Sequence, residues 1–223
     1  MRKTGVIIAA AGSSTRMDSG PKKEYRALGK KTVIQHSVAP FLQIESLYSI
    51  VLAISKGQEE KMRLALGDVA FNEHVRYVEG GATRQESVYK ALQVMKNDAP
   101  DIVLIHDGAR PWVTASVIRR VEEAAYSHGA AAPGVIPADA MKNVDGKMNI
   151  KTHLKRTDLV AVQTPQGFLY ADILAAHEKA QKDGREYLDD TEVYWQYKGK
   201  VKVIEGDPKN RKITFAHDVG GIS

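Results

Sequence analysis

Cysteine is absent from this chain of 223 residues, and its absence removes a whole group of chemistries. Disulfide bonds, thiolate nucleophiles and cysteine-ligated metal sites are excluded together. Apolar runs are short, and none approaches the roughly 20 residues that a membrane-spanning helix needs. The N-terminal MRKTG leads directly into an expected strand, which leaves no room for a signal peptide. We therefore expect a cytoplasmic protein with no membrane partner.

Aromatic residues are also scarce, at 7% of the chain, and no basic run is interleaved with them. This argues against a nucleic-acid partner, although the formal net charge of +5 still favours anionic ligands. Apolar residues make up 43% and charged residues 26%, the mixture of an ordinary globular protein. The length suits one domain over residues 1–223 with a substantial core.

Two common phosphate-binding loops are missing. No GxxxxGK[ST] string occurs, and the first expected strand is followed by one glycine, Gly12, instead of GxGxxG. In their place stand the small residues 9–15 and a basic cluster that includes Arg16, Lys22 and Lys23. Small side chains let backbone N–H groups approach a ligand closely. The stretch suits a nucleoside triphosphate; the alternative is an ordinary strand-to-helix turn with solvated charges.

Strand-like and helix-like patterns alternate along the chain, which predicts an α/β fold with a mostly parallel sheet. Buried strands are expected at residues 6–8, 49–54, 75–78, 102–105, 160–163 and 201–205. Helices are expected at residues 34–42, 58–66, 114–125 and 170–181, and from about residues 83 and 189. Thr114 is the expected N-cap of its helix. Residues 164–168 are interpreted as a polar turn.

Residues 138–160 interrupt this alternation. Asp145-Gly146 lies between two short alternating stretches, which is a strong signal for a β-hairpin. The hairpin has few large apolar side chains, and a two-stranded hairpin alone is marginal in water. We expect it to be an arm that packs on a second subunit; the alternative is an unattached surface hairpin.

Several unusual strings fall where strands are expected to end, and ligands of open α/β sheets bind at those ends. They include residues 12–16, residues 80–84 and residues 106–111. Among them, Asp107 suits a divalent cation that bridges phosphates; the alternatives are a helix cap or a salt bridge to Arg110. His106 is expected to be structural.

Together these strings resemble the 2-C-methyl-D-erythritol 4-phosphate cytidylyltransferase family over nearly the whole chain. The matching segments are AAAG with Arg16-Met17, Lys23-Glu24-Tyr25, Gly80-Gly81 with Arg84 and Ser87-Val88, HDGARP at 106–111, Thr164-Pro165-Gln166, Asp189-Asp190, and Gly206 with Asn210 and Lys212-Ile213-Thr214. The chain departs from the family pattern at Ser14, Lys22, Glu24, Gly108, Ala140 and Arg211.

The resemblance implies a single Rossmann-like nucleotidyltransferase domain with a protruding hairpin arm, acting as a homodimer with Mg²⁺. Its substrates would be CTP and a sugar-alcohol phosphate, in non-mevalonate isoprenoid precursor synthesis. Arg16 and Lys23 would be catalytic, Arg156 and Lys212 would bind the substrate phosphate, and Asp107 would bind the metal. The nucleotide would be bound by Ala10, Ala11, Gly12, Gly81, Arg84, Ser87, Asp107 and Gly108.

Two alternatives remain at this point. One is the related ribitol-5-phosphate cytidylyltransferase, whose members usually have LAGG and HDSVRP where this chain has AAAG and HDGARP. The other is a non-catalytic nucleotide-binding regulator on the same scaffold. Retention of Arg16, Lys23, Asp107 and Lys212 together argues against a regulator, because a sensor would not need both charged clusters.

Overall fold

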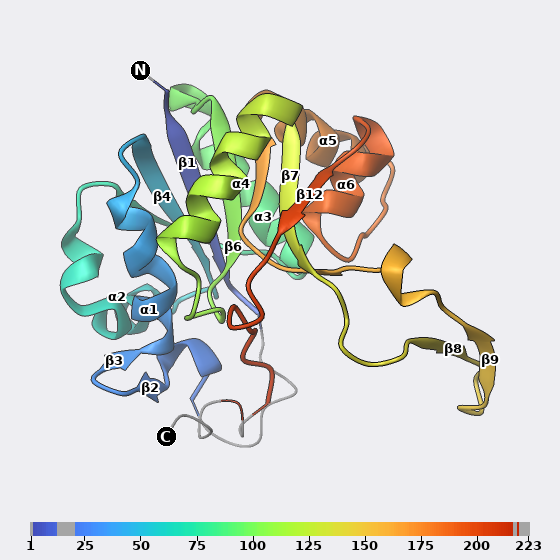
Figure 1. Ribbon diagram of the computed structural model, residues 1–223. Coiled ribbons are helices and arrows are strands. Elements are labelled where there is room, and N and C mark those ends of the chain that lie inside the picture. Colours follow the sequence, from blue (N-terminus) through green and yellow to red (C-terminus); the bar gives the residue numbers. More distant parts are fainter. Residues whose placement is uncertain (1, 13–20, 216–217, 219–223) are drawn as a thin grey trace.

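A mostly parallel β-sheet forms the centre of the computed structural model, which describes residues 2–12, 21–215 and 218 (Figure 1). The strands run in the order β10-β7-β11-β6-β1-β4-β5, and β12 pairs with β7. The eight strands are β1 (Thr4–Ala10), β4 (Leu47–Ile54), β5 (Val75–Glu79), β6 (Ile102–Asp107), β7 (Ala130–Val135), β10 (Ala161–Val162), β11 (Gln166–Leu169) and β12 (Lys202–Glu205).

Strand β1 is central and buried on both faces. It pairs in parallel with β4 on one side and β6 on the other, so that Ile7 lies opposite Val51 and Ile105. Val6 and Ile8 belong to one apolar cluster and Ile7 to a second one on the opposite face. The alternation follows from the two-residue period of a strand and explains why the run is continuously apolar.

Helices cover both faces of the sheet, with α4 in front and α3 behind in Figure 1. The first apolar cluster includes side chains of α1, α2 and α4, and the second includes side chains of α3, α5 and α6. The helices are α1 (Val33–Val38), α2 (Glu59–Leu66), α3 (Arg84–Val94), α4 (Ala115–His128), α5 (Tyr170–Lys182) and α6 (Asp190–Tyr197). The 3-10 helices are η1 (Lys23–Tyr25), η2 (Ala39–Gln43), η3 (Gly67–Phe71), η4 (Lys96–Asp98) and η5 (Arg156–Asp158).

Most of the expected elements are present, and the predicted α/β class with a mostly parallel sheet is confirmed. The hydroxyl of Thr114 accepts a hydrogen bond from the Val117 N–H and caps α4 as expected. The helix expected at residues 34–42 is divided into α1 and η2, because Pro40 lacks the N–H that would continue the ladder. Within the described residues, no helix has the length and apolar character needed to cross a membrane.

Two strands of the central sheet were not expected. Strand β7 is buried but consists largely of alanine, with Pro133 and Gly134 near its end, so it lacks the usual β-branched signal. Residues 164–168, interpreted as a polar turn, contain the start of β11, which runs antiparallel between β6 and β7. Gly167 permits this position, since a Cβ there would lie 2.9 Å from Cγ1 of Val121.

The expected hairpin is present and extends away from the rest of the domain (Figure 1). Its strands β8 (Lys142–Val144) and β9 (Ile150–His153) pair antiparallel. Val144 pairs with Ile150, so the turn is longer than a two-residue turn. The Asp145 carboxylate stabilises it by accepting hydrogen bonds from the N–H groups of Lys147 and Asn149 at 2.9 and 3.0 Å. A smaller pair, β2 (Ala27–Leu28) and β3 (Lys31–Thr32), precedes α1.

Candidate active site

Three loops meet where the parallel strands end. The loop after β1 packs directly on the loop after β5, because a Cβ added to Gly80 would lie only 2.4 Å from Cβ of Ala11. The loop after β6 is tied to β1 by a hydrogen bond of 3.0 Å from the Gly108 N–H to the Ala9 carbonyl. The structure thus brings together the expected nucleotide-binding segments around Ala10, Ala11, Gly12, Gly81 and Gly108.

Lys22 closes the start of the nucleotide loop. Its ammonium group donates to the carbonyl of Gly12 at 2.9 Å and to the hydroxyl of Ser55, which in turn donates to the Ala11 carbonyl at 2.8 Å. Burial lowers the pKa of Lys22, against the opposing effect of Glu24. Lys22 is one of the positions where the chain departs from the family pattern, so the resemblance did not predict this contact. Arg16 lies outside the described residues.

The next turn, η1, carries Lys23 and the buried Glu24. Burial raises the pKa of Glu24, and the positive charges of Lys23, Lys22 and Lys212 oppose that shift. These lysines therefore lie close enough to Glu24 to act on its charge. Lys212 comes from the far end of the chain, so η1 and the C-terminal segment form one positively charged region.

Asp107 is the centre of this region. Its carboxylate lies 3.3 Å from Arg84 Nε, 3.5 Å from Arg110 Nε and 2.8 Å from Lys212 Nζ. Burial alone would raise the pKa of Asp107, but Arg84, Lys212 and Arg110 hold it well below its usual range. Asp107 therefore stays ionised and organises three cations from separate parts of the chain. Of the two alternatives stated above, the salt bridge to Arg110 is present.

Arg84 has a second acidic partner that was not assigned a role from the sequence. Its Nη1 donates to Asp190 Oδ2 at 2.7 Å, a shorter contact than that to Asp107. Burial would lower the pKa of Arg84, but Asp190 and Asp107 raise it. The guanidinium is therefore held between two carboxylates at the start of α3.

The turn before α3 is built on hydroxyl groups. Thr83 caps the helix by accepting from the Glu86 N–H. The Ser87 hydroxyl accepts from the Gly81 N–H at 3.0 Å and donates to the Thr83 carbonyl at 2.8 Å. Ser87 is buried, so its hydroxyl shapes the loop in which the expected base-binding Gly81 lies.

Below Asp107, buried polar groups connect β6 to the C-terminal segment. His106 is fully buried, and its two ring nitrogens contact the Thr164 hydroxyl at 2.9 Å and the Arg110 carbonyl at 3.2 Å. Burial lowers the pKa of His106 to about 4. Asn210 donates to the Thr164 carbonyl at 2.8 Å. These contacts hold the neutral His106 in place beneath Asp107. In the sequence, this network was indicated only by the family motifs that contain Thr164 and Asn210.

Arg156 is the one expected site residue in the described part that lies apart from this region. It is exposed at the base of the arm, where its Nη1 donates to the Ala138 carbonyl at 3.0 Å. The arm points away from the carboxyl end of β6 in Figure 1. Within one chain, Lys212 therefore contacts Asp107, and Lys23 and Lys212 both act on the charge of Glu24, whereas the hydrogen bond of Arg156 is to the base of the arm.

A family model described as "IspD: 2-C-methyl-D-erythritol 4-phosphate cytidylyltransferase" matches residues 4–221. The chain belongs to this family. As a member of the cytidylyltransferase family, it is a nucleotidyltransferase enzyme.

The 2-C-methyl-D-erythritol 4-phosphate cytidylyltransferase of Clostridium botulinum (strain Langeland / NCTC 10281 / Type F) is 38% identical, over 98% of this chain and 95% of that protein. The "Bifunctional enzyme IspD/IspF" of Rhodopseudomonas palustris (strain BisA53) is also 38% identical, over 97% of this chain but 54% of its own length. The chain thus spans about half the length of that bifunctional relative.

Solved structures in the family share the fold. The 4-diphosphocytidyl-2C-methyl-D-erythritol synthase of Anaerococcus prevotii DSM 20548 aligns with a TM-score of 0.85 and 27% identity, over 98% of this chain and 93% of that one. The 2-C-methyl-D-erythritol 4-phosphate cytidylyltransferase of Thermus thermophilus aligns with a TM-score of 0.79 and 30% identity, over 99% and 96%.

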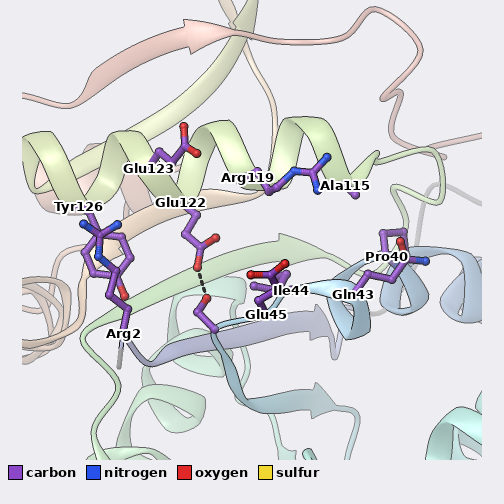
Figure 2. Close-up of a pocket in the computed structure, with 11 residues that line it drawn as sticks. Arg2, Pro40, Gln43, Ile44, Glu45, Ala115, Arg119, Glu122, Glu123 and Tyr126 are labelled. Carbon is purple, nitrogen blue, oxygen red and sulfur yellow. Dashed lines mark hydrogen bonds between the residues drawn. The ribbon is translucent and has the colours of Figure 1, made fainter.

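A separate cleft of about 290 Å³ lies between α4 and residues 40–46 (Figure 2). Glu122 occupies its centre and accepts hydrogen bonds from the hydroxyls of Thr4 and Ser46. Those two residues stand at the amino ends of β1 and β4. The cleft therefore belongs to the edge of the sheet opposite the expected nucleotide site.

Proposed function

We infer that this protein transfers the cytidylyl group of CTP to 2-C-methyl-D-erythritol 4-phosphate, as its family membership indicates. An oxygen of the sugar phosphate forms a bond to the α-phosphorus of CTP. The bond from that phosphorus to the oxygen of the departing pyrophosphate breaks, and the leaving oxygen keeps the electron pair. The products are 4-diphosphocytidyl-2-C-methyl-D-erythritol and pyrophosphate.

The observation that carries this proposal is the cluster of Arg84, Arg110 and Lys212 around Asp107. Two polyanions must meet in line for the reaction, so their charge has to be neutralised at the place where they meet. The nucleophile is already an anion and needs no general base. This agrees with a site where the buried His106 has both nitrogens engaged within the protein.

The roles of individual residues follow from this chemistry. We assign stabilisation of charge on the α-phosphoryl group to Lys23 and Arg16. Lys212 and Arg156 would bind the phosphate of the sugar substrate. The nucleotide would lie over Ala10, Ala11, Gly12, Gly81 and Gly108, with Arg84 and Ser87 shaping the cytosine side. The close approach of Ala11 to Gly80 supports this placement, because it leaves the loop backbone uncovered by large side chains.

Asp107 is the carboxylate that we propose for a divalent cation, which would replace part of its contacts to Arg84, Arg110 and Lys212. Among the residues that the structure describes, no group of three His, Asp or Glu side chains could hold a metal by itself. Mg²⁺ typically binds one or two carboxylates and completes its shell with phosphate oxygens and water. We therefore propose that Asp107 holds Mg²⁺ together with the nucleotide phosphates. The ion would neutralise part of the phosphate charge.

The arm is proposed to complete the site of a second subunit. Its apolar side chains are largely exposed, with Met148 at 77% and Ile150 at 60%, which is unusual unless a partner covers them. A two-fold dimer that exchanges arms would bury them and deliver Arg156 to the neighbouring site.

A pyrophosphate-release assay tests the function directly. CTP is supplied with either 2-C-methyl-D-erythritol 4-phosphate or ribitol 5-phosphate, and with Mg²⁺ or a chelator. We expect turnover with the methylerythritol substrate that depends on the metal. Preference for ribitol 5-phosphate would overturn the substrate assignment, and binding of CTP without turnover on either substrate would favour a regulator.

A further inference from the structure

The Arg84 guanidinium is fixed by two carboxylates that are distant in sequence. Nη1 lies 2.7 Å from Asp190 Oδ2, and Nε lies 3.3 Å from Asp107 Oδ1. About 27% of the Arg84 side chain stays exposed, whereas that of Asp190 is only 1% exposed. The guanidinium is therefore held by two carboxylates through different nitrogens, while part of the side chain stays exposed to a ligand.

Asp190 is supported in turn by a fully buried histidine. Its other oxygen, Oδ1, lies 3.1 Å from Nε2 of His177, whose side chain is completely buried in α5. A carboxylate can only accept, so Nε2 of His177 carries the proton. The ring also stacks on Tyr89, with centroids 6.4 Å apart and planes at 4°. Tyr89 belongs to α3, the helix that Arg84 begins.

We propose that Asp190 is a positioning residue that orients Arg84 toward CTP, and that His177 supports Asp190 from the core. The inference rests on the proposed function, which places Arg84 beside the nucleotide. With Asp190 in place, the guanidinium is already oriented when the ligand arrives, so less rotamer freedom is lost on binding. Without it, Arg84 retains only the longer contact to Asp107 and can turn onto that carboxylate.

An orienting role for Asp190 and a purely structural role differ in their expected effect on CTP affinity. A contact that merely attaches α6 to the domain would affect the melting temperature and leave CTP affinity unchanged in the folded protein. An orienting contact acts on the nucleotide in the ground state and the transition state alike. It therefore changes the dissociation constant and KM for CTP and leaves kcat nearly unchanged.

The first variant is Asp190→Asn, with CTP binding measured by calorimetry and turnover by pyrophosphate release. We expect CTP affinity to fall about tenfold, the scale of one misplaced hydrogen bond to a charged group, with kcat within about threefold of wild type. Asp189→Asn is the matched control. Asp189 caps α6 through the Glu192 N–H at 3.0 Å, and asparagine caps equally well, so the control should keep its affinity.

Further variants test whether Asp190 acts on CTP binding through Arg84 and is itself supported by His177. In an Arg84→Met background, Asp190→Asn should cause no additional loss of affinity, because residues that act through one another are not additive. His177→Phe keeps the ring against Tyr89 but removes the donor to Asp190, so it should weaken CTP binding. His177→Gln restores an N–H donor and should recover part of the affinity.

Unchanged CTP affinity in Asp190→Asn, or a full additional loss in the Arg84→Met background, would overturn the proposal. If Asp190→Asn does not fold, His177→Phe and His177→Gln decide it: equal affinities in the two would be evidence against it. Because the dissociation constant is measured without the second substrate, an enzyme that binds CTP but does not turn over would contradict the proposed function and leave this test intact.

Discussion

Mixing two inactive variants tests whether the arm of one subunit completes the site of another. Lys23→Ala removes a charge beside the nucleotide loop, whereas Arg156→Ala removes one at the base of the arm. In the structure Arg156 is exposed and contacts only the Ala138 carbonyl among its described hydrogen-bond partners, so its loss should not unfold the domain. Each variant alone should retain about one hundredth of wild-type activity or less, the scale for losing one preorganised charge.

The expected recovery follows from the two-fold symmetry of the proposed dimer. Random exchange of subunits makes about half of the dimers mixed. In a mixed dimer with exchanged arms, one site combines an intact Lys23 with an intact Arg156 from its neighbour, and the other site carries both lesions. Activity should therefore rise to about a quarter of wild type. If Arg156 acted within its own subunit, every site in the mixture would carry one lesion.

The assay is pyrophosphate release after the two variants have been mixed and re-equilibrated. Native mass spectrometry of subunits with different tags verifies the exchange. The control mixes Lys23→Ala with the double variant Lys23→Ala/Arg156→Ala, which cannot form a complete site in any dimer. A mixture that remains as inactive as its parents after verified exchange would refute the exchanged arm.

Four further outcomes are expected. Lys23→Ala should lower kcat about a hundredfold without changing the melting temperature, and near-normal turnover would contradict its catalytic role. CTP should exceed ATP and GTP by orders of magnitude in kcat/KM, because we expect the loop around Gly81 to exclude a purine. Comparable turnover with a purine would contradict this expectation. Gly80→Ala should weaken CTP binding and destabilise the protein by about 1–3 kcal/mol in urea unfolding, since its Cβ would overlap Ala11; wild-type stability would argue against this packing. Because cations lower the pKa of Asp107 in the fold, its stabilising contribution is present above the unfolded value of 3.8 and is lost as the pH falls below it. The free energy of unfolding should therefore fall less steeply on acidification in Asp107→Asn than in the wild type. Equal slopes in the two proteins would contradict a lowered pKa of Asp107.

The central elements could be predicted because their signals are local. The apolar run of β1, the cap at Thr114 and the Asp-Gly turn of the arm each act within a few residues. Strand β7 was not predicted because its alanines carry little strand preference. Strand β11 was not predicted because its first residues are polar. Gly167 is needed there because Val121 of α4 packs close to it, and the local sequence gives no sign of this contact.

The candidate site shows the same division. Its residue types and their order could be predicted, since strand ends in an open sheet converge on one edge. Their pairing could not, because Arg84 meets Asp190 across 106 positions of the chain. Lys22 departs from the family pattern, and its contacts to the Gly12 carbonyl and the Ser55 hydroxyl depend on the tertiary structure.

The antiparallel direction of β11 has a consequence for the arm. Strand β7 ends at Val135 and β11 begins at Gln166, and since they run in opposite directions, both points lie on the same edge of the sheet. The arm therefore leaves the sheet after Val135 and returns through β10, in which Ala161 pairs with Val135. Thr164 follows shortly after β10, and its hydroxyl accepts a hydrogen bond from the Asp107 N–H at 3.1 Å. The length and sequence of the arm can change during evolution without altering the sheet register.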